Sequence, residues 1–100
     1  DTAPASAHAL PRIADALQGA LLLLVDGGIR RGTDVLKAIA LGASAVLLGR
    51  PAIYGLAHAG AAGVAHVLRL LRDELEIAMA LTGCATLAQA TSALLQAPRR

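Results

Sequence analysis

The sequence predicts an α/β fold in which parallel strands alternate with helices. Two short apolar runs, residues 21–25 and 45–48, are bounded by glycines, and the segment between them has the apolar spacing of a helix. Strand, helix and strand joined by short connections form the right-handed parallel crossover unit. A chain that is 56% hydrophobic and 16% charged also excludes a disordered polypeptide. Because two strands do not complete a sheet, we expect these 100 residues to be part of a larger domain.

The first helix is expected over residues 7–17, where apolar side chains recur on one face. Ser6 is the expected cap, and Gly19 the expected stop. Residues 21–25 follow as an unbroken apolar run, which is typical of a strand buried on both faces of a parallel sheet.

The second helix is expected over residues 31–41, because Asp34 suits the positive end of a helix and Gly42 suits its C-terminal end. Residues 45–48 then form the second predicted strand, which closes on Gly49. Each strand is therefore followed at once by a glycine-containing loop and a helix.

The second half of the chain is expected to be helical, with a short helix over 51–59, a long helix over 61–81, and two brief helices at 87–90 and 92–95. The Arg99-Arg100 tail is expected to fray. Opposite charges at i, i+4 spacing predict a solvated face on the long helix, made of Arg69, Arg72, Asp73, Glu74 and Glu76. Its other side carries a wide apolar stripe, made of Val64, Val67, Leu68, Leu70, Leu71, Leu75, Ile77 and Leu81.

Composition argues against several kinds of partner. The net charge of +2 is small, and Tyr54 is the only aromatic residue, so no nucleic-acid surface is predicted. The longest uncharged stretches, 51–68 and 77–98, are broken by glycine and polar residues, and we predict no membrane span. Cys84 stands alone, which permits no internal disulfide and favours the reducing cytoplasm.

No catalytic or metal-binding cluster is evident either. The three histidines, His8, His58 and His66, lack metal-ligand spacing and a nearby carboxylate partner in the sequence, so packing or solvent-facing roles are expected for them. Cys84 is interpreted as a structural thiol, Tyr54 as a packing residue, and Lys37 as an ordinary helix lysine.

Chemistry is predicted at the two loops that follow the strands, Asp26-Gly27-Gly28-Ile29-Arg30 and Gly49-Arg50. Glycine-rich turns and helix starts present unpaired backbone N–H groups, which match a phosphate, and an arginine can add a forked contact. Asp26 is placed to accept a hydrogen bond from a hydroxyl group. A tight Gly-Gly turn with surface arginines is the plainer interpretation, but two such loops at adjacent strand ends favour a phosphate site.

The stretch from Val25 to Ala38, with Gly49-Arg50-Pro51, Arg72-Asp73-Glu74-Leu75-Glu76 and Leu81-Thr82-Gly83-Cys84, resembles the C-terminal part of a known family. This family is the FMN-dependent 2-hydroxy-acid oxidases and dehydrogenases, which include glycolate oxidase, lactate oxidase and mandelate dehydrogenase. Other phosphate-binding barrels, such as inosine monophosphate dehydrogenase, share the Asp-Gly-Gly-Ile-Arg loop. The Gly-Arg-Pro segment and the Arg-Asp-Glu-Leu helix favour the hydroxy-acid family.

The resemblance implies a (β/α)₈ barrel, of which this chain would supply the last two strand-helix units and the closing helices. It also implies that Asp26, Gly27, Gly28, Ile29 and Arg30 hold the ribityl and phosphate part of FMN, with Gly49 and Arg50 completing the phosphate cradle. The family's catalytic histidine and its carboxylate-binding arginine lie in a Ser-Asn-His-Gly-x-Arg-Gln motif, just before the segment that matches residues 1–4. That motif is absent from this sequence.

Two hypotheses follow. In the first, the chain is the FMN phosphate-binding part of a cytoplasmic enzyme that oxidises a small (S)-2-hydroxy acid to the 2-oxo acid, and it is inactive alone. In the second, it is a truncated, non-catalytic scaffold that self-associates and retains some anion binding. Both predict association of its apolar faces, either with another copy or with the rest of a barrel.

Overall fold

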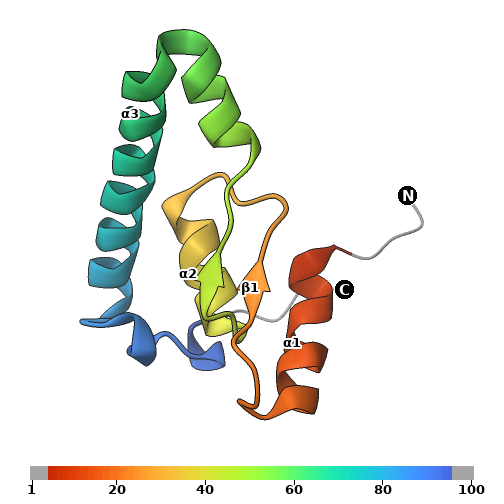
Figure 1. The fold of residues 1–100 in the computed structure, drawn as a ribbon. Helices are drawn as coiled ribbons and strands as arrows, with labels where there is room; N and C mark the ends of the chain where they lie inside the picture. The colour runs from red at the N-terminus through yellow and green to blue at the C-terminus, as the bar shows by residue number, and fades with distance from the viewer. Residues whose placement is uncertain (1–4, 96–100) are drawn as a thin grey trace, which may run out of the picture.

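The computed structural model describes residues 5–95, and it alternates helices and strands as expected (Figure 1). The order of elements is α1 (Ser6–Leu17), β1 (Leu24–Val25), α2 (Gly32–Ala40), β2 (Ala45–Val46), α3 (Arg50–Thr82) and two 3₁₀ turns, η1 (Leu87–Gln89) and η2 (Ser92–Leu94). The two brief C-terminal helices of the prediction are therefore 3₁₀ turns. The predicted fraying of Arg99-Arg100 lies outside the described residues.

The two strands pair in parallel, as the crossover pattern predicts, with Leu24 opposite Ala45 and Val25 opposite Val46. The N–H of Leu47 donates to the carbonyl of Val25 at 2.8 Å and extends the pairing beyond the strands. This register places the carboxyl ends of both strands at the same edge, and the two glycine-containing loops begin there (Figure 1).

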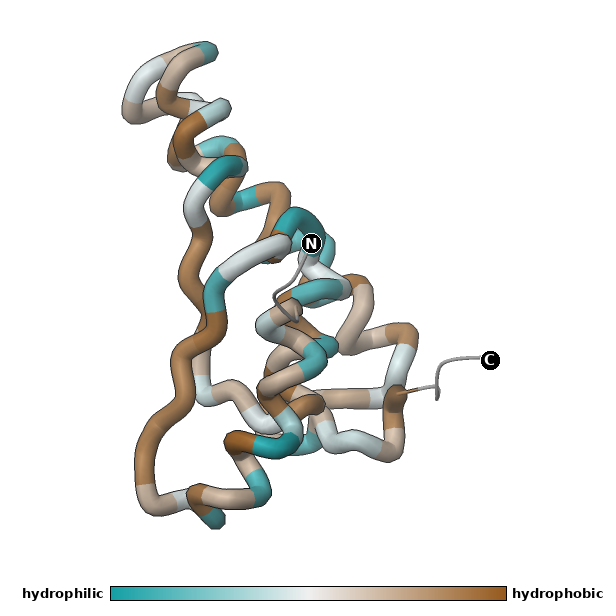
Figure 2. Tube along the Cα trace, turned by 90° about the vertical axis from the view of Figure 1, so that its right-hand side faces the viewer, coloured by the Kyte–Doolittle hydropathy of each residue, from teal (hydrophilic) through white to brown (hydrophobic). Residues whose placement is uncertain are grey.

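The predicted burial of residues 21–25 on both faces is wrong for this structure. Val25 is buried, but Leu22 is 84% exposed and Leu24 is 61% exposed. Figure 2 shows this hydrophobic run along the periphery of the molecule. The physical reason is that the helices cover only one side of a sheet of two strands, so alternate side chains have no covering layer.

The caps of α1 differ from the prediction at one end. Ser6 is the first helical residue and Ala5 is the N-cap, with no side-chain hydrogen bond to cap the helix. At the other end, Gln18 and Gly19 both adopt positive φ angles, so the chain leaves the helix where Gly19 predicts a stop.

Helix α3 is two helices joined at a kink, which agrees with the separate short and long helices predicted. Ala59 and Gly60 have non-helical backbone angles, and the shorter N-terminal part folds back along the longer one (Figure 1). Gly55 and Gly63 meet across this fold, where a Cβ on Gly55 would lie 2.6 Å from the carbonyl oxygen of Gly63. Only residues without a side chain allow the two backbones to approach this closely.

Two small clusters of buried residues hold these elements together. One lies between α1, β1 and α2 and is made of Leu10, Val25, Ile29, Ala38 and Ala43. The other lies between α2, α3 and the C-terminal turns and is made of Leu36, Ala40, Ala78, Cys84 and Ala90. Cys84 therefore has the structural position expected of it. The alanines allow close helix packing, which explains the composition.

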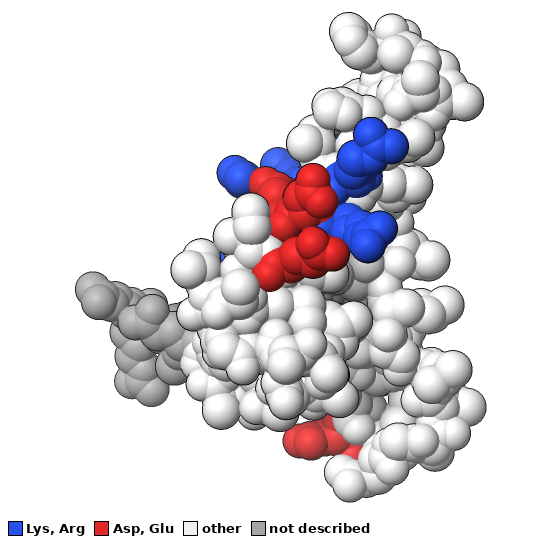
Figure 3. All heavy atoms as spheres, turned by 90° about the vertical axis from the view of Figure 1, so that its left-hand side faces the viewer, with Lys and Arg blue, Asp and Glu red and all other residues white. Residues whose placement is uncertain are grey.

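Charged residues of the longer, C-terminal part of α3 gather on one side, with both signs intermixed (Figure 3). The predicted pair of Arg72 and Glu76 is present, with Nε and Oε1 3.3 Å apart. Arg69 and Asp73 do not form the predicted pair within residues 5–95. No helix in this described part of the chain is long and apolar enough to span a membrane.

Candidate functional site

The two predicted loops meet in one hollow of about 420 Å³ at the carboxyl ends of the strands. All seven residues that the sequence singles out line it, together with three neighbours that follow β2 or begin α3. The lining consists of Asp26, Gly27, Gly28, Ile29, Arg30, Leu47, Leu48, Gly49, Arg50 and Pro51. The parallel register is what brings them together, because it starts both loops at the same edge of the sheet.

The first loop depends on its two glycines. Gly27 and Gly28 have φ angles of +90° and +75°, in the left-handed region that residues with a Cβ rarely adopt. Successive turns of this kind form concave arrangements of backbone N–H groups that bind anions. Ile29, by contrast, is buried in the core, so only its backbone is available to a ligand while its side chain anchors the loop.

The second loop leads directly into a helix start. Gly49 is the N-cap of α3, Arg50 is its first residue, and Pro51 follows. The N–H groups of a first helical turn have no partner within the helix and carry a partial positive charge. A helix start at the hollow is therefore a second source of donors for an anion.

The arginines and Asp26 complete the lining, and all three are exposed. Within residues 5–95, neither Arg30 nor Arg50 forms an ion pair, so both guanidinium groups are available to a ligand. Backbone N–H groups and guanidinium forks suit a phosphate, and Asp26 is the single carboxylate of the lining. The donor set fits a phosphate that carries a hydroxyl-bearing chain.

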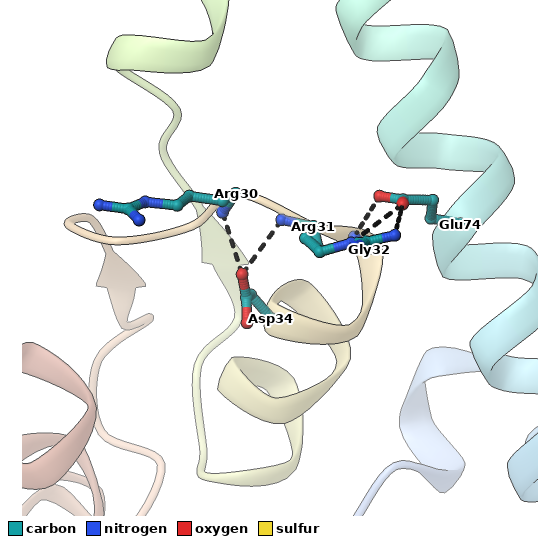
Figure 4. A network of polar contacts seen from close by, with 5 residues as sticks. All are labelled: Arg30, Arg31, Gly32, Asp34 and Glu74. Atoms are coloured by element: carbon teal, nitrogen blue, oxygen red, sulfur yellow. Dashed lines mark hydrogen bonds and ion pairs between the residues drawn. The ribbon is translucent and has the colours of Figure 1, made fainter.

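A network outside the hollow fixes the end of the first loop (Figure 4). The carboxylate of Glu74, on α3, accepts hydrogen bonds from the side chain of Arg31 at 2.6 Å and from the N–H of Gly32 at 3.1 Å. The hydrogen bond from the Gly32 N–H is the largest cause that lowers the pKa of Glu74 from its ordinary value, and the hydrogen bond from the Arg31 side chain is the next. Asp34 accepts from the N–H groups of Arg30 and Arg31, both at 3.1 Å.

Sequence reasoning missed the role of Glu74, which it placed on a solvated helix face. Nothing in the spacing of α3 distinguishes Glu74 from its neighbours, because its partners lie more than 40 positions earlier in the chain. The role of Asp34 at the start of α2 could be predicted from the sequence, because an acidic residue is favourable in the first turn of a helix.

The histidines do not enter the hollow. His8, His58 and His66 are exposed on α1 and α3, and none of them lines it. Residues 5–95 contain no group of three or more His, Cys, Asp or Glu side chains that could hold a metal ion. Tyr54 is 67% exposed, so its expected packing role is wrong for this structure.

Fold and site together define an α/β protein with a glycine- and arginine-lined hollow at the carboxyl ends of parallel strands. A family model described as FMN-dependent dehydrogenase matches residues 1–97. The chain belongs to this family, whose cofactor is FMN.

Two curated relatives are identical to this chain at more than half of the aligned positions. Glycolate oxidase 1 of Zea mays is 56% identical over 91 residues, which are 91% of this chain and 25% of that protein. L-lactate oxidase of Roseobacter sp. (strain GAI101) is 58% identical over 95 residues, which are 95% of this chain and 26% of that protein. The chain thus spans about a quarter of the length of these relatives.

The fold is similar to that of a solved mandelate oxidase in complex with benzoyl-formic acid. The TM-score is 0.87 at 51% identity, over 90% of this chain and 27% of that structure. The described strands and helices therefore correspond to one part of a larger FMN-dependent oxidase fold.

Proposed function

We propose that this chain is the phosphate-anchoring C-terminal part of an FMN-dependent (β/α)₈ barrel enzyme that oxidises a small (S)-2-hydroxy acid to the 2-oxo acid. The observation that carries the proposal is the single hollow shared by Gly27, Gly28, Arg30, Gly49 and Arg50. Loops after the last strands of such barrels often build a phosphate site with the start of a helix. The proposed reaction, oxidation of a small 2-hydroxy acid, is the one named for the glycolate oxidase and L-lactate oxidase relatives.

Each lining residue has a proposed role toward FMN. The backbone N–H groups of Gly27, Gly28 and Gly49 and the guanidinium groups of Arg30 and Arg50 would hold the phosphate, and Asp26 would accept a hydrogen bond from a ribityl hydroxyl. Ile29 would contribute its backbone. When bound, FMN supplies the two-electron redox chemistry, and the protein supplies binding and orientation.

We assign no catalytic residue to this chain. Within residues 5–95, the lining of the hollow includes no histidine, its one carboxylate, Asp26, has a proposed role toward the ribityl chain, and the sequence has no Ser-Asn-His-Gly-x-Arg-Gln motif. The substrate-contacting groups would therefore come from the rest of the barrel. The reducing cytoplasm is the proposed location, supported by the single, buried Cys84.

A comparison of the affinities for FMN and riboflavin tests the proposed phosphate site. FMN and riboflavin differ by the phosphate alone, so the protein should bind FMN at least about tenfold more tightly, given the strength of charge-assisted hydrogen bonds. Flavin fluorescence measures both affinities. The Arg50→Gln variant should lose most of this preference, whereas Arg69→Gln, which removes an exposed arginine of α3 outside the hollow, should keep it. Equal affinities for the two flavins in the wild-type protein would refute the assignment.

The second candidate function is a non-catalytic scaffold that self-associates, and the exposed apolar side chains favour it. Leu21, Leu22, Leu24, Ile77 and Leu81 are all at least 60% exposed. The two candidates differ in the flavin experiment, because a scaffold needs no preference for FMN over riboflavin. They agree that the 100-residue chain alone does not oxidise lactate or glycolate.

A further inference from the structure

The hydrogen bonds of Glu74 link α3 to the end of the loop that lines the hollow. Its carboxylate accepts from Nε and Nη2 of Arg31, at 3.1 and 2.6 Å, and from the N–H of Gly32 at 3.1 Å. The Gly32 N–H belongs to the first turn of α2, where no intrahelical acceptor exists. Glu74 therefore caps α2 from another helix and holds the residue that follows Arg30 and Arg31.

Close packing leaves this connection little freedom. A Cβ on Gly32 would collide with the backbone N of Leu75 and would lie 2.6 Å from the Cβ of Glu74. The start of α2 thus rests directly on the backbone of α3. A movement of α3 at this point must move Gly32, and with it the end of the loop.

A second carboxylate fixes the same loop end from within α2. Asp34 accepts hydrogen bonds from the N–H groups of both Arg30 and Arg31 at 3.1 Å. These two N–H groups are therefore occupied, and Arg30 can offer an anion only its side chain. Figure 4 shows the side chains of Arg30 and Arg31 leaving the backbone in opposite directions, with Arg31 extended toward Glu74.

We propose that Glu74 is a positioning residue for the phosphate site: by holding Arg31 and Gly32, it orients Arg30 toward the anion in the hollow. This inference rests on the proposed function. Glu74 does not line the hollow, so it acts only through the loop that it holds. Both contacts hold the pKa of Glu74 below its ordinary value, because each hydrogen bond favours the charged carboxylate.

The chain offers a matched control on the same helix. Glu76 pairs with Arg72 at 3.3 Å, both side chains are well exposed, and within residues 5–95 neither side chain forms a hydrogen bond or ion pair with the loop. Glu74→Gln and Glu76→Gln therefore remove the same charge from α3 with the same change of shape. Only the first alters the contacts to Arg31 and Gly32.

The test measures affinities for FMN and riboflavin by flavin fluorescence in the full chain, with circular dichroism to verify folding. Glu74→Gln should lower the FMN-to-riboflavin affinity ratio about tenfold, the effect of one charge-assisted hydrogen bond. Glu76→Gln should change it by less than about twofold, as exposed pairs do. A general loss of structure would weaken both flavins alike, whereas a positioning role weakens FMN selectively.

Arg31→Gln provides a second test that does not depend on α2 capping. This variant removes the hydrogen bonds between the Arg31 side chain and Glu74, and it leaves the hydrogen bond from the Gly32 N–H to Glu74 in place. We expect about a threefold loss in the same ratio, since the remaining contact preserves part of the orientation. The double variant should be no worse than Glu74→Gln.

The outcomes separate the two proposals. A wild-type protein that prefers FMN, with Glu74→Gln and Arg31→Gln variants that keep the full preference, would overturn the positioning role and leave the phosphate site intact. A wild-type protein without any preference for FMN would overturn both the proposed function and this inference.

Discussion

The backbone at Gly28 sets the shape of the first loop that lines the hollow. Its φ of +75° lies in the left-handed region, and a Cβ there would meet no atom within 4 Å, so strain and not crowding opposes a side chain. Gly28→Ala should reduce the free energy of unfolding by about 1 kcal/mol, the cost of the left-handed conformation for an L-residue. Chemical denaturation measures this difference.

Gly49 provides the comparison for Gly28. A Cβ on Gly49 would also lie in open space, and the φ of −114° at this position lies outside the left-handed region. Gly49→Ala should therefore cost less than Gly28→Ala. An equal or larger loss for Gly49→Ala would contradict the account based on backbone strain.

Glu74 should give the protein a specific acid sensitivity. Its pKa in the folded protein lies below the ordinary value of 4.5, so its stabilising contribution is present above that value and is lost as the pH falls through the lowered pKa. Glu74→Gln should flatten the dependence of unfolding free energy on pH in this acid range. Urea denaturation at a series of pH values measures it.

Arg31→Gln refines the acid-range prediction, because the hydrogen bond from the Gly32 N–H is the largest single cause of the lowered pKa of Glu74 and does not involve Arg31. This variant should retain part of the wild-type pH dependence. A profile for Arg31→Gln as flat as that of Glu74→Gln would show that the Gly32 N–H does not lower the pKa of Glu74.

At the level of elements, the fold of α3 on itself depends on Gly55 and Gly63. Replacing glycine by alanine inside a helix normally stabilises it by up to about 1 kcal/mol. Gly63→Ala should instead destabilise the protein by about 1–3 kcal/mol, because its methyl group would collide with the carbonyl of Gly55. Thermal unfolding followed by circular dichroism gives the sign. A stabilised Gly63→Ala variant would mean that the two parts of α3 do not pack closely.

At the level of the whole molecule, the structure is open for its length. Its radius of gyration is 14.5 Å, against about 13 Å for a compact domain of 100 residues. Leu22 and Leu24, at the edge formed by β1, are 84% and 61% exposed. Large exposed apolar surfaces of this kind favour association.

The 100-residue chain should therefore self-associate at micromolar concentrations, and the double variant Leu22→Gln, Leu24→Gln should do so less. Analytical ultracentrifugation over a range of concentrations measures the average mass. Thr33→Gln, a change at an exposed position on α2 away from β1, serves as a control. A wild-type chain that stays monomeric throughout would contradict this expectation.

Most of the element order and seven of the ten residues that line the hollow could be predicted from the sequence. Gly27, Gly28 and Gly49 follow apolar runs, and these local signals specify strand ends and helix starts. The kink near Gly60 is predictable in the same way, because the glycines there divide two helical patterns. Such features depend on residues close together in the chain, which a periodicity or a turn motif can reveal.

Only the tertiary structure decided how segments far apart in the sequence meet. In the folded chain Glu74 accepts a hydrogen bond from the N–H of Gly32, and Gly55 packs against Gly63. Leu22 and Leu24 remain exposed. The sequence by itself determined where the chain turns and which glycines and arginines follow each strand, because those properties are local. Which side chain meets which partner depends on how the helices pack, and packing is set by the summed contacts of the whole molecule.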